Sequence, residues 1–140
     1  MTNTVLFGME IKDNDKCDFC KIVPDSLLHM FCDCAIIAKL WNSVNDWLCA
    51  KIKVNFTLTS FNKLFGIETC KYGCNSHLIN CVLLCARFVI YRCKYANRKP
   101  TVNEFIRTVY STFQSELRVA RDKGTIKKNT LKWKKLLTDM

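Results

Sequence analysis

The stretch CDFCKIVPDSLLHMFCDC, residues 17–34, holds four cysteines and one histidine within eighteen residues. Two residues separate Cys17 from Cys20, so a short turn can direct both thiolates to one cation. Four residues separate His29 from Cys34. Three thiolates and one imidazole form the donor set of a closed, tetrahedral structural zinc site. We therefore expect Cys17, Cys20, His29 and Cys34 to bind one Zn²⁺.

Cys32 is an alternative fourth ligand. We favour Cys34, because the gap after His29 allows about one full helical turn between the ligands. The outer spacings C-x2-C and H-x4-C match those of the retroviral zinc knuckle, with a longer central loop. The remaining interpretation is a set of reduced structural thiols beside a chance histidine.

A second cysteine pattern lies further along the chain. It reads Cys70-x3-Cys74-x2-His77-x3-Cys81, with Cys85 one turn later. Two of its cysteines, like Cys93, lie in an apolar helical stretch, where thiols behave as small buried hydrophobes. We favour core thiols over a second metal site.

Length and composition indicate one folded domain, residues 1–140. Half of the residues are apolar, which argues against general disorder. The first residues, MTNTVLFGMEIKDNDK, show no basic start followed by a long apolar run, so no signal peptide is visible. We expect an intracellular protein of the nucleus or cytoplasm, where clustered cysteines are more often ligands than disulfides.

The hydrophobic periodicity predicts a mostly α-helical domain. The zinc-binding segment and an aromatic helix would occupy residues 1–50, and a basic helical part residues 78–140. Short motifs place the helix ends: Thr59 or Ser60 and Gly66 bound one helix, and Thr101 with Glu104 forms a capping box that opens another. Expected helices cover residues 35–48, 60–65, 78–95, 101–121 and 126–137.

The apolar run 78–91 contains Arg87 and is too short to span a membrane, so we expect a buried helix and no membrane partner.

The excess of positive over negative charge lies in the later part of the chain. Residues 1–86 hold eight Lys/Arg and eight Asp/Glu, whereas residues 87–140 hold fourteen and four. This asymmetry indicates a polyanionic partner, and its alternative is a solvated basic face. Helical periodicity places the candidate phosphate contacts opposite the apolar faces: Arg107, Arg118, Arg121, Lys127, Lys128, Lys134 and Lys135. Candidate stacking groups for unpaired bases are Tyr91, Tyr95 and Trp133. The alternative is that they are core residues, which is the commoner role of aromatic side chains on helices of mixed face.

The sequence contains no recognisable catalytic pattern. It has no paired-aspartate motif, no glycine-rich phosphate loop and no HExxH, and zinc binding would occupy the one close Cys–His pair. We therefore do not expect an enzyme.

An ordered series of segments resembles one family. LFGMEIKDNDKCDFCKIVPDSLLHMFCDC, LWNSVNDWL, LTSFNKLFGI and LLCARFVIYRCKYANRKPTVNEF follow the order of the region after the polymerase in non-LTR (LINE-type) retrotransposon reverse transcriptases. The resemblance implies a zinc-binding C-terminal segment that holds template RNA or target DNA. It places Cys17, Cys20, His29 and Cys34 on ligand positions, and Arg87 and Lys94 on a basic helix.

The polymerase and endonuclease domains of that family are missing from this sequence. The resemblance therefore implies a non-catalytic, zinc-stabilised nucleic-acid-binding fragment, with the polymerase domain of a retroelement as a partner. Two alternatives are a piece of an active RNA-directed DNA polymerase that has no function alone, and a basic protein-interaction domain.

Overall fold

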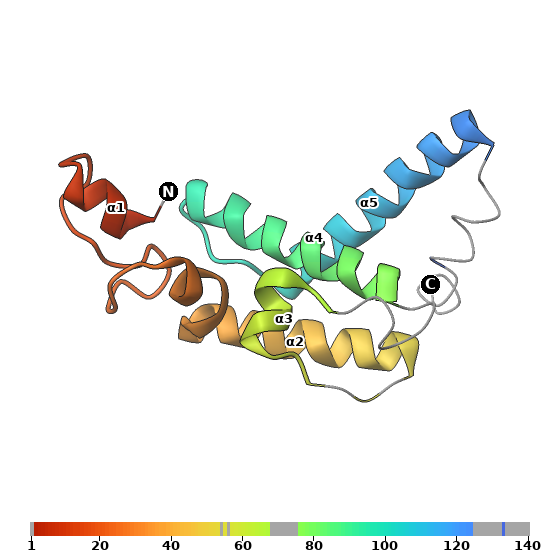
Figure 1. Ribbon diagram of the computed structural model, residues 1–140, viewed down its shortest axis with the longest axis horizontal. Coiled ribbons are helices and arrows are strands. Elements are labelled where there is room, and N and C mark those ends of the chain that lie inside the picture. Colours follow the sequence, from red (N-terminus) through yellow and green to blue (C-terminus); the bar gives the residue numbers. More distant parts are fainter. Residues whose placement is uncertain (1, 54, 56, 68–75, 125–132, 134–140) are drawn as a thin grey trace.

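The computed structural model describes residues 2–53, 55, 57–67, 76–124 and 133. The chain is mostly helical, as the sequence predicts. Its elements are α1 (Asn3–Gly8), the π-helical turn η1 (His29–Asp33), α2 (Ala35–Ile52), α3 (Ser60–Phe65), α4 (Ser76–Tyr95) and α5 (Val102–Lys123) (Figure 1). The described residues contain no strand, only an isolated antiparallel bridge between Lys16 and Pro24.

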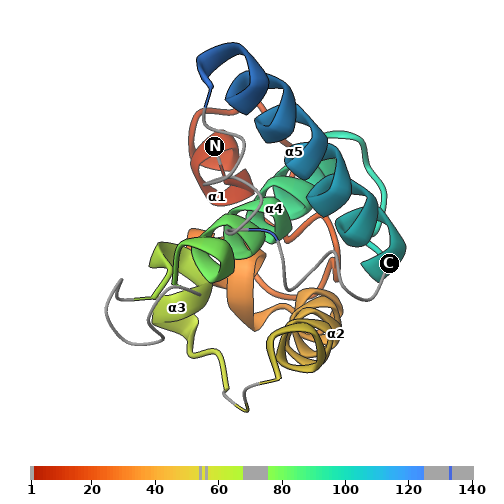
Figure 2. The same ribbon diagram turned by 90° about the vertical axis from the view of Figure 1, so that its right-hand side faces the viewer.

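Helix α4 lies in the middle of the molecule. It packs against α5 on one side and against α2 and α3 on the other (Figures 1 and 2). The cysteine-rich segment and α1 gather at the C-terminal end of α4 (Figure 1). The later turns of α5 extend away from α2 and α4. The metal-binding sequence and the basic helix therefore share one scaffold, α4.

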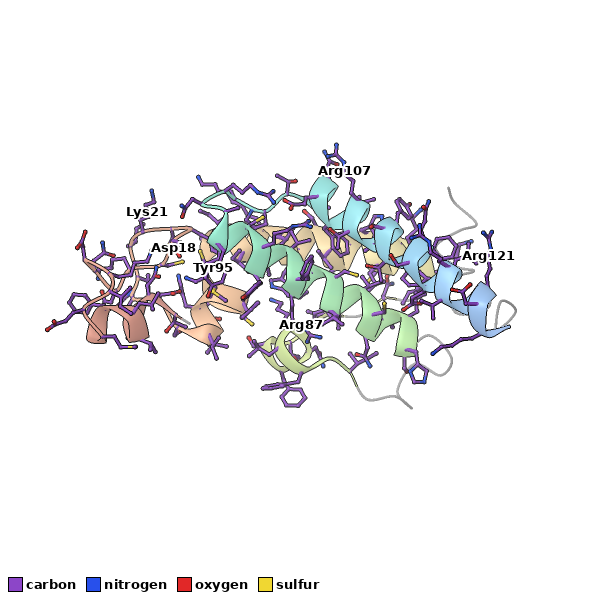
Figure 3. All side chains as sticks on the ribbon, turned by 90° about the horizontal axis from the view of Figure 1, so that it is seen from above. Asp18, Lys21, Arg87, Tyr95, Arg107 and Arg121 are labelled. Atoms are coloured by element: carbon purple, nitrogen blue, oxygen red, sulfur yellow. The ribbon has the colours of Figure 1, made fainter. Side chains whose placement is uncertain are left out.

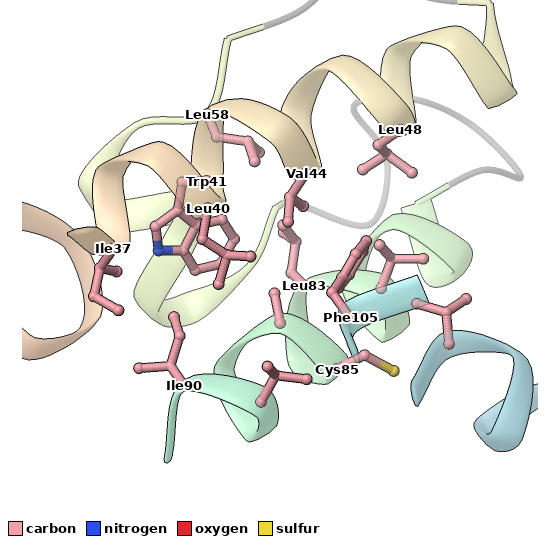
Figure 4. Packing of buried hydrophobic residues seen from close by; sticks show 14 of the residues in the cluster. Ile37, Leu40, Trp41, Val44, Leu48, Leu58, Leu83, Cys85, Ile90 and Phe105 are labelled. Atoms are coloured by element: carbon pink, nitrogen blue, oxygen red, sulfur yellow. The ribbon is translucent and has the colours of Figure 1, made fainter. Parts of the chain in front are cut away.

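The core forms where α2 faces α4 and α5 (Figure 4). Helix α2 repeats its apolar residues at the spacing of one helical face, and this face is buried: Ile37, Leu40, Trp41, Val44 and Leu48. Trp47 meets Phe105 of α5 edge to face, with ring centroids 5.3 Å apart. Burying side chains of this size contributes about 1.5–3 kcal/mol each, so α2 is held mainly by its apolar face.

The expected helix 78–95 is present, but the short length of the apolar run within it does not exclude a membrane span. Helix α4 has 20 residues, because the helix continues on both sides of the run 78–91. It is long and apolar enough to cross a membrane, with a mean hydropathy of 1.3, but 56% of that window is buried inside the protein. Core helices of soluble proteins pass the same test, so this is weak evidence for a membrane span.

The helix starts agree with the sequence signals, with one correction. Thr59 and Asn62 form a reciprocal capping box on α3, and the side chain of Thr101 accepts a hydrogen bond from Glu104 N at 3.2 Å. The predicted return bond from the Glu104 carboxylate is not observed. That carboxylate instead accepts hydrogen bonds from Arg92 and Arg98, because two guanidinium groups bind it more strongly than one amide.

Glycine is required where α3 ends. Gly66 has φ +85°, and a Cβ atom there would lie 2.5 Å from Oδ1 of Asn80. Asn80 uses that oxygen to accept from Ile67 N at 2.7 Å, and its amide donates to Ile67 O at 3.1 Å. One α4 side chain thereby holds the segment that follows α3.

The expected last helix, residues 126–137, lies outside the described residues apart from Trp133. The Trp133 side chain is 1% exposed, and its indole donates a hydrogen bond to Oε2 of Glu116 at 2.7 Å. Its ring packs against Phe113. Trp133 is therefore a core residue, the alternative to its role as a stacking group for bases.

Candidate metal centre and basic surface

Cys17 and Cys20 lie in a short hairpin, residues 16–24, which we call the cysteine hairpin. Cys17 N donates to Val23 O, and Lys21 N donates to Cys17 O, each at 2.9 Å. Lys21 adopts a left-handed conformation with φ 60°, which costs a non-glycine residue about 1–2 kcal/mol. The turn also directs the amide of Phe19 to Sγ of Cys17, at 3.4 Å. Such backbone donors favour a thiolate.

His29 and Cys34 are brought together by the π-helical turn. The amide of Cys34 donates to the carbonyl of His29 at 2.9 Å, the i to i+5 bond that defines this turn. Ser26 stabilises the start of the turn by accepting from His29 N at 3.1 Å. The H-x4-C spacing thus corresponds to one turn of π-helix, a wider turn than the α-helical one we expected.

The four predicted ligands converge. One donor atom from each of Cys17, Cys20, His29 and Cys34 lies within 4.8 Å of the others. The Sγ atoms of Cys17 and Cys34 are 4.0 Å apart, and Sγ of Cys20 lies 3.4 Å from Nε2 of His29. Tetrahedral bonds of about 2.3 Å to sulfur and 2.0–2.1 Å to nitrogen give donor separations of roughly 3.5–3.8 Å. Small movements suffice to hold a metal ion.

Cys34 belongs to this centre and Cys32 does not. Cys32 is buried on the opposite side of the turn, where its Sγ lies 3.8 Å from the carbonyl of Ser60. Within the described part of the chain, the four convergent ligands are the one group of three or more Cys, His, Asp or Glu side chains with this geometry.

The pKa values of the two hairpin thiols are shifted in opposite directions. Burial raises the pKa of Cys17 to about 12. Burial acts in the same direction on Cys20, but the amides of Val23 and Ile22 and the ring of His29 outweigh it and lower its pKa to about 6. A metal ion binds the thiolate form, so the lowered pKa of Cys20 favours metal binding and the raised pKa of Cys17 opposes it.

Lys94 is not on the surface, so the expectation that it contacts phosphate was wrong. Its ammonium lies 2.7 Å from Asp18 and 2.9 Å from Asp25, and its side chain is 3% exposed. Burial alone would lower the pKa of Lys94, but the two carboxylates raise it. Lys94 therefore joins α4 to both sides of the metal-binding segment.

Helix α1 completes this buried network. Asn3 N donates to Oδ2 of Asp25 at 2.6 Å, and the Asn3 amide donates to Oδ1 of Asp18 at 2.8 Å. Asp18 lies between the two hairpin cysteines in sequence. The metal-binding segment, α1 and α4 are thus connected through one set of polar contacts.

Arg87 also has a structural role instead of the predicted phosphate contact. Its guanidinium donates to the carbonyls of Lys63 and Leu64, at 3.3 and 2.6 Å. These carbonyls end α3, where backbone acceptors lack helical partners. Burial lowers the pKa of Arg87. The residue holds α3 against α4.

The predicted basic face of α5 is exposed where the structure describes it. Arg107, Arg118 and Arg121 are all exposed, and Figure 3 shows Arg107 and Arg121 pointing outward near the two ends of the helix. The other predicted contacts, Lys127, Lys128, Lys134 and Lys135, lie outside the described residues.

The structure places three further cations, Arg92, Arg98 and Lys99, beside the predicted contact Arg107. A groove of about 740 Å³ between α4 and α5 is lined by Arg92, Arg98, Lys99 and Arg107. Two of them, Arg98 and Lys99, belong to the basic run NRKP, residues 97–100, which precedes α5.

The second cysteine pattern shows no convergent site among its described members. Cys70 and Cys74 lie outside the described residues, and His77 is exposed. Sγ of Cys85 contacts the hydroxyl of Thr112 at 3.4 Å, on the face of α4 that packs against α5.

No protein-family model matches the chain, and no curated protein matches it either.

Proposed function

We propose that this chain is a non-catalytic, zinc-stabilised module that binds nucleic acid through α5 and its neighbouring basic groove. The observation that carries the proposal is the exposed row Arg107, Arg118 and Arg121 on α5. This helix belongs to the stretch of sequence, residues 87–140, that holds all ten excess charges. Cationic side chains on one surface neutralise phosphates and release counterions, which gives affinity without sequence preference.

We propose zinc as the metal of the Cys17–Cys34 centre. Three thiolates and an imidazole favour a borderline-soft ion that accepts tetrahedral geometry, and four protein ligands leave no position open for substrate. The role is therefore structural. It is supported by the buried positions of Cys17, His29 and Cys34. None of the described cysteines forms a disulfide, which suits an intracellular compartment.

The resemblance to the region after the polymerase of LINE-type reverse transcriptases supplies the context. In that context the module would hold template RNA or target DNA beside a polymerase domain. The alternative hypothesis is that the segment binds nucleic acid only when it is attached to that polymerase.

Fluorescence anisotropy with a labelled single-stranded RNA tests the proposal. If about five side chains neutralise phosphates, log K should fall against log salt with a slope near −3.5, at ~0.7 per contact. The double variant Arg118→Glu/Arg121→Glu should weaken all RNA sequences equally and flatten the slope. The matched control, Lys39→Glu/Lys53→Glu, makes the same charge change at exposed positions on and beside α2.

Affinity that ignores salt, or that falls equally in both double variants, would contradict binding through α5. A basic protein-interaction domain is the second candidate, favoured by the same exposed arginines. An acidic protein ligand that RNA cannot displace would support it instead.

A further inference from the structure

Helix α4 exposes a row of aromatic rings on one face of its C-terminal half. Phe88, Tyr91 and Tyr95 are 50%, 51% and 53% exposed. Their spacing of three and four residues aligns them along one side of the helix. The rings of Tyr91 and Tyr95 lie 4.8 Å apart. We call these three residues the aromatic row.

The aromatic row borders the basic groove between α4 and α5. Phe88 belongs to both, because it lines the groove together with Arg92. The guanidinium of Arg92 lies 5.1 Å from the centre of the Phe88 ring, within cation–π distance. Four cationic side chains and one carboxylate, that of Glu104, line the groove, so its charge is strongly positive.

The single negative charge of Glu104 does not cancel the positive charge of the groove. Glu104 is held by Arg92 and Arg98, at 2.9 and 2.5 Å, in two ion pairs. Arg107 and Lys99 are exposed on either side. The hydroxyl group of Ser111 also lines the groove and can donate to a phosphate oxygen. The Thr108 hydroxyl, in contrast, donates to the carbonyl of Glu104 at 2.9 Å.

We propose that the aromatic row and the basic groove form one binding surface for a single-stranded segment of nucleic acid. Bases would stack on Tyr91, Tyr95 and Phe88, and the sugar–phosphate chain would follow the groove. Seven residues of helix from Phe88 to Tyr95 span about 10 Å. At about 3.4 Å per nucleotide this accommodates two or three bases. The inference rests on the proposed function and adds to it the strandedness of the ligand and the groups that select it.

A single strand fits this surface better than a duplex or an acidic protein. A duplex keeps its base faces stacked inside, so it can use the groove but not the aromatic row. An acidic peptide satisfies the cations but has no planar bases for the rings. Single strands offer both features, and base–aromatic stacking tolerates any sequence.

The test compares two aromatic pairs with the same spacing. Tyr91→Leu/Tyr95→Leu removes the π faces and keeps apolar side chains on the helix. Phe61→Leu/Phe65→Leu makes the equivalent change on α3, where the rings are 65% and 72% exposed and outside the groove. The probes are a labelled 12-nucleotide oligouridylate and an RNA duplex of the same length, measured by anisotropy over a salt series.

We expect the tyrosine variant to bind the oligouridylate about tenfold more weakly or worse, as expected when base stacking is lost. Its salt slope and its duplex affinity should not change, because no phosphate contact is removed. The phenylalanine variant should bind both probes as the wild type does. Circular dichroism and zinc content verify that both variants fold.

Two results would overturn the inference. If the tyrosine variant binds the oligouridylate as the wild type does while Arg118→Glu/Arg121→Glu weakens it, the module binds nucleic acid but not through the aromatic row. If neither probe binds the wild type and an acidic peptide does, the proposed function fails as well.

Discussion

The C-terminal end and the middle of α4 lie in regions that are held together by different forces. Around its C-terminal end, residues 2–34 contain one short helix, a hairpin and a π-helical turn. Their buried contacts include a polar network that joins Asn3, Asp25 and Lys94. Around its middle, α2, α4 and α5 bury continuous apolar faces, including Trp41, Leu83 and Phe105. The first region is organised by ligands and ion pairs, and the second by hydrophobic burial.

This difference teaches where a metal is needed. A segment of some thirty residues with little regular structure cannot bury enough apolar area to offset its loss of chain entropy. The helical region can do so. The two regions should therefore respond differently when the metal, an ion pair or a single thiol is removed.

The largest effect should follow loss of the metal. Cys17→Ser or His29→Ala should reduce bound zinc from one per chain to none and unfold residues 2–34, because structural zinc contributes about 10–16 kcal/mol of apparent binding energy to folding. Native mass spectrometry counts the metal, and hydrogen exchange locates the unfolding. Protection in α2 and α4 should largely remain.

Cys32→Ser is the matched control for this prediction. Cys32 is as buried as the ligands but contacts Ser60 instead of the centre, so the variant should keep its zinc. A folded chain that contains no metal and ignores a strong chelator would show that the four ligands form no structural site.

Much of this fold was predictable from periodicity and end signals. The apolar face of α2 repeats so regularly that Ile37, Trp41 and Val44 identify a buried helix without further information. Gly66 ends α3 as predicted, and of the two predicted N-caps, Thr59 and Ser60, the structure uses Thr59. The ligand set was predictable because C-x2-C and H-x4-C are local spacings, and local geometry follows from local sequence.

Which basic side chains are buried and which are exposed could not be predicted in the same way. Lys94 and Arg87 occupy basic positions of a helix, but burial and partners depend on segments far away in sequence. Asp18 and Asp25 lie 76 and 69 residues from Lys94. A single sequence gives no sign of such pairs, whereas Arg107 on a strongly amphipathic helix was correctly expected to be exposed.

A second, smaller effect should come from the junction between the two regions. Lys94→Met leaves the carboxylate of Asp25, which is 0% exposed, without its cation. Breaking a buried ion pair costs about 3–5 kcal/mol. Urea unfolding should show this loss, and Lys99→Met, at an exposed position, should change stability by less than about 0.5 kcal/mol.

Adding Asp25→Asn to Lys94→Met distinguishes charge from shape. The second substitution removes the uncompensated charge, so the double variant should be more stable than Lys94→Met alone. A double variant that is less stable than the single one would mean that packing, not the buried charge, holds the junction.

A third effect, of about 1 kcal/mol, should depend on pH and be confined to the helical region. Burial would raise the pKa of Glu104, but hydrogen bonds from Arg98, Cys93 and Arg92 outweigh it and lower the pKa. Because the pKa of Glu104 is lower in the folded state than its value of about 4.3 in the unfolded chain, the ionised carboxylate stabilises the fold above that pH. This stabilisation is lost as the pH falls through the pKa of the folded state. The stability difference between wild type and Glu104→Gln should be constant from pH 5 to pH 7 and shrink below it. A difference that stays constant down to acid unfolding would contradict this assignment.

The smallest effect should come from a cysteine that binds no metal. Cys93 is fully buried on α4, and its Sγ lies 3.3 Å from Oε2 of Glu104. Burial, together with that carboxylate, raises the pKa of Cys93 to about 11, so the thiol is protonated and donates to Glu104. A serine hydroxyl can make the same bond in similar volume, and Cys93→Ser should therefore cost less than about 1 kcal/mol. Cys93→Val has the size but not the donor, so it should cost more. If a thermal melt shows Cys93→Ser to be as damaging as Cys17→Ser, the thiols of α4 are not mere packing groups, and the contrast between a metal-organised end and an apolar core would fail.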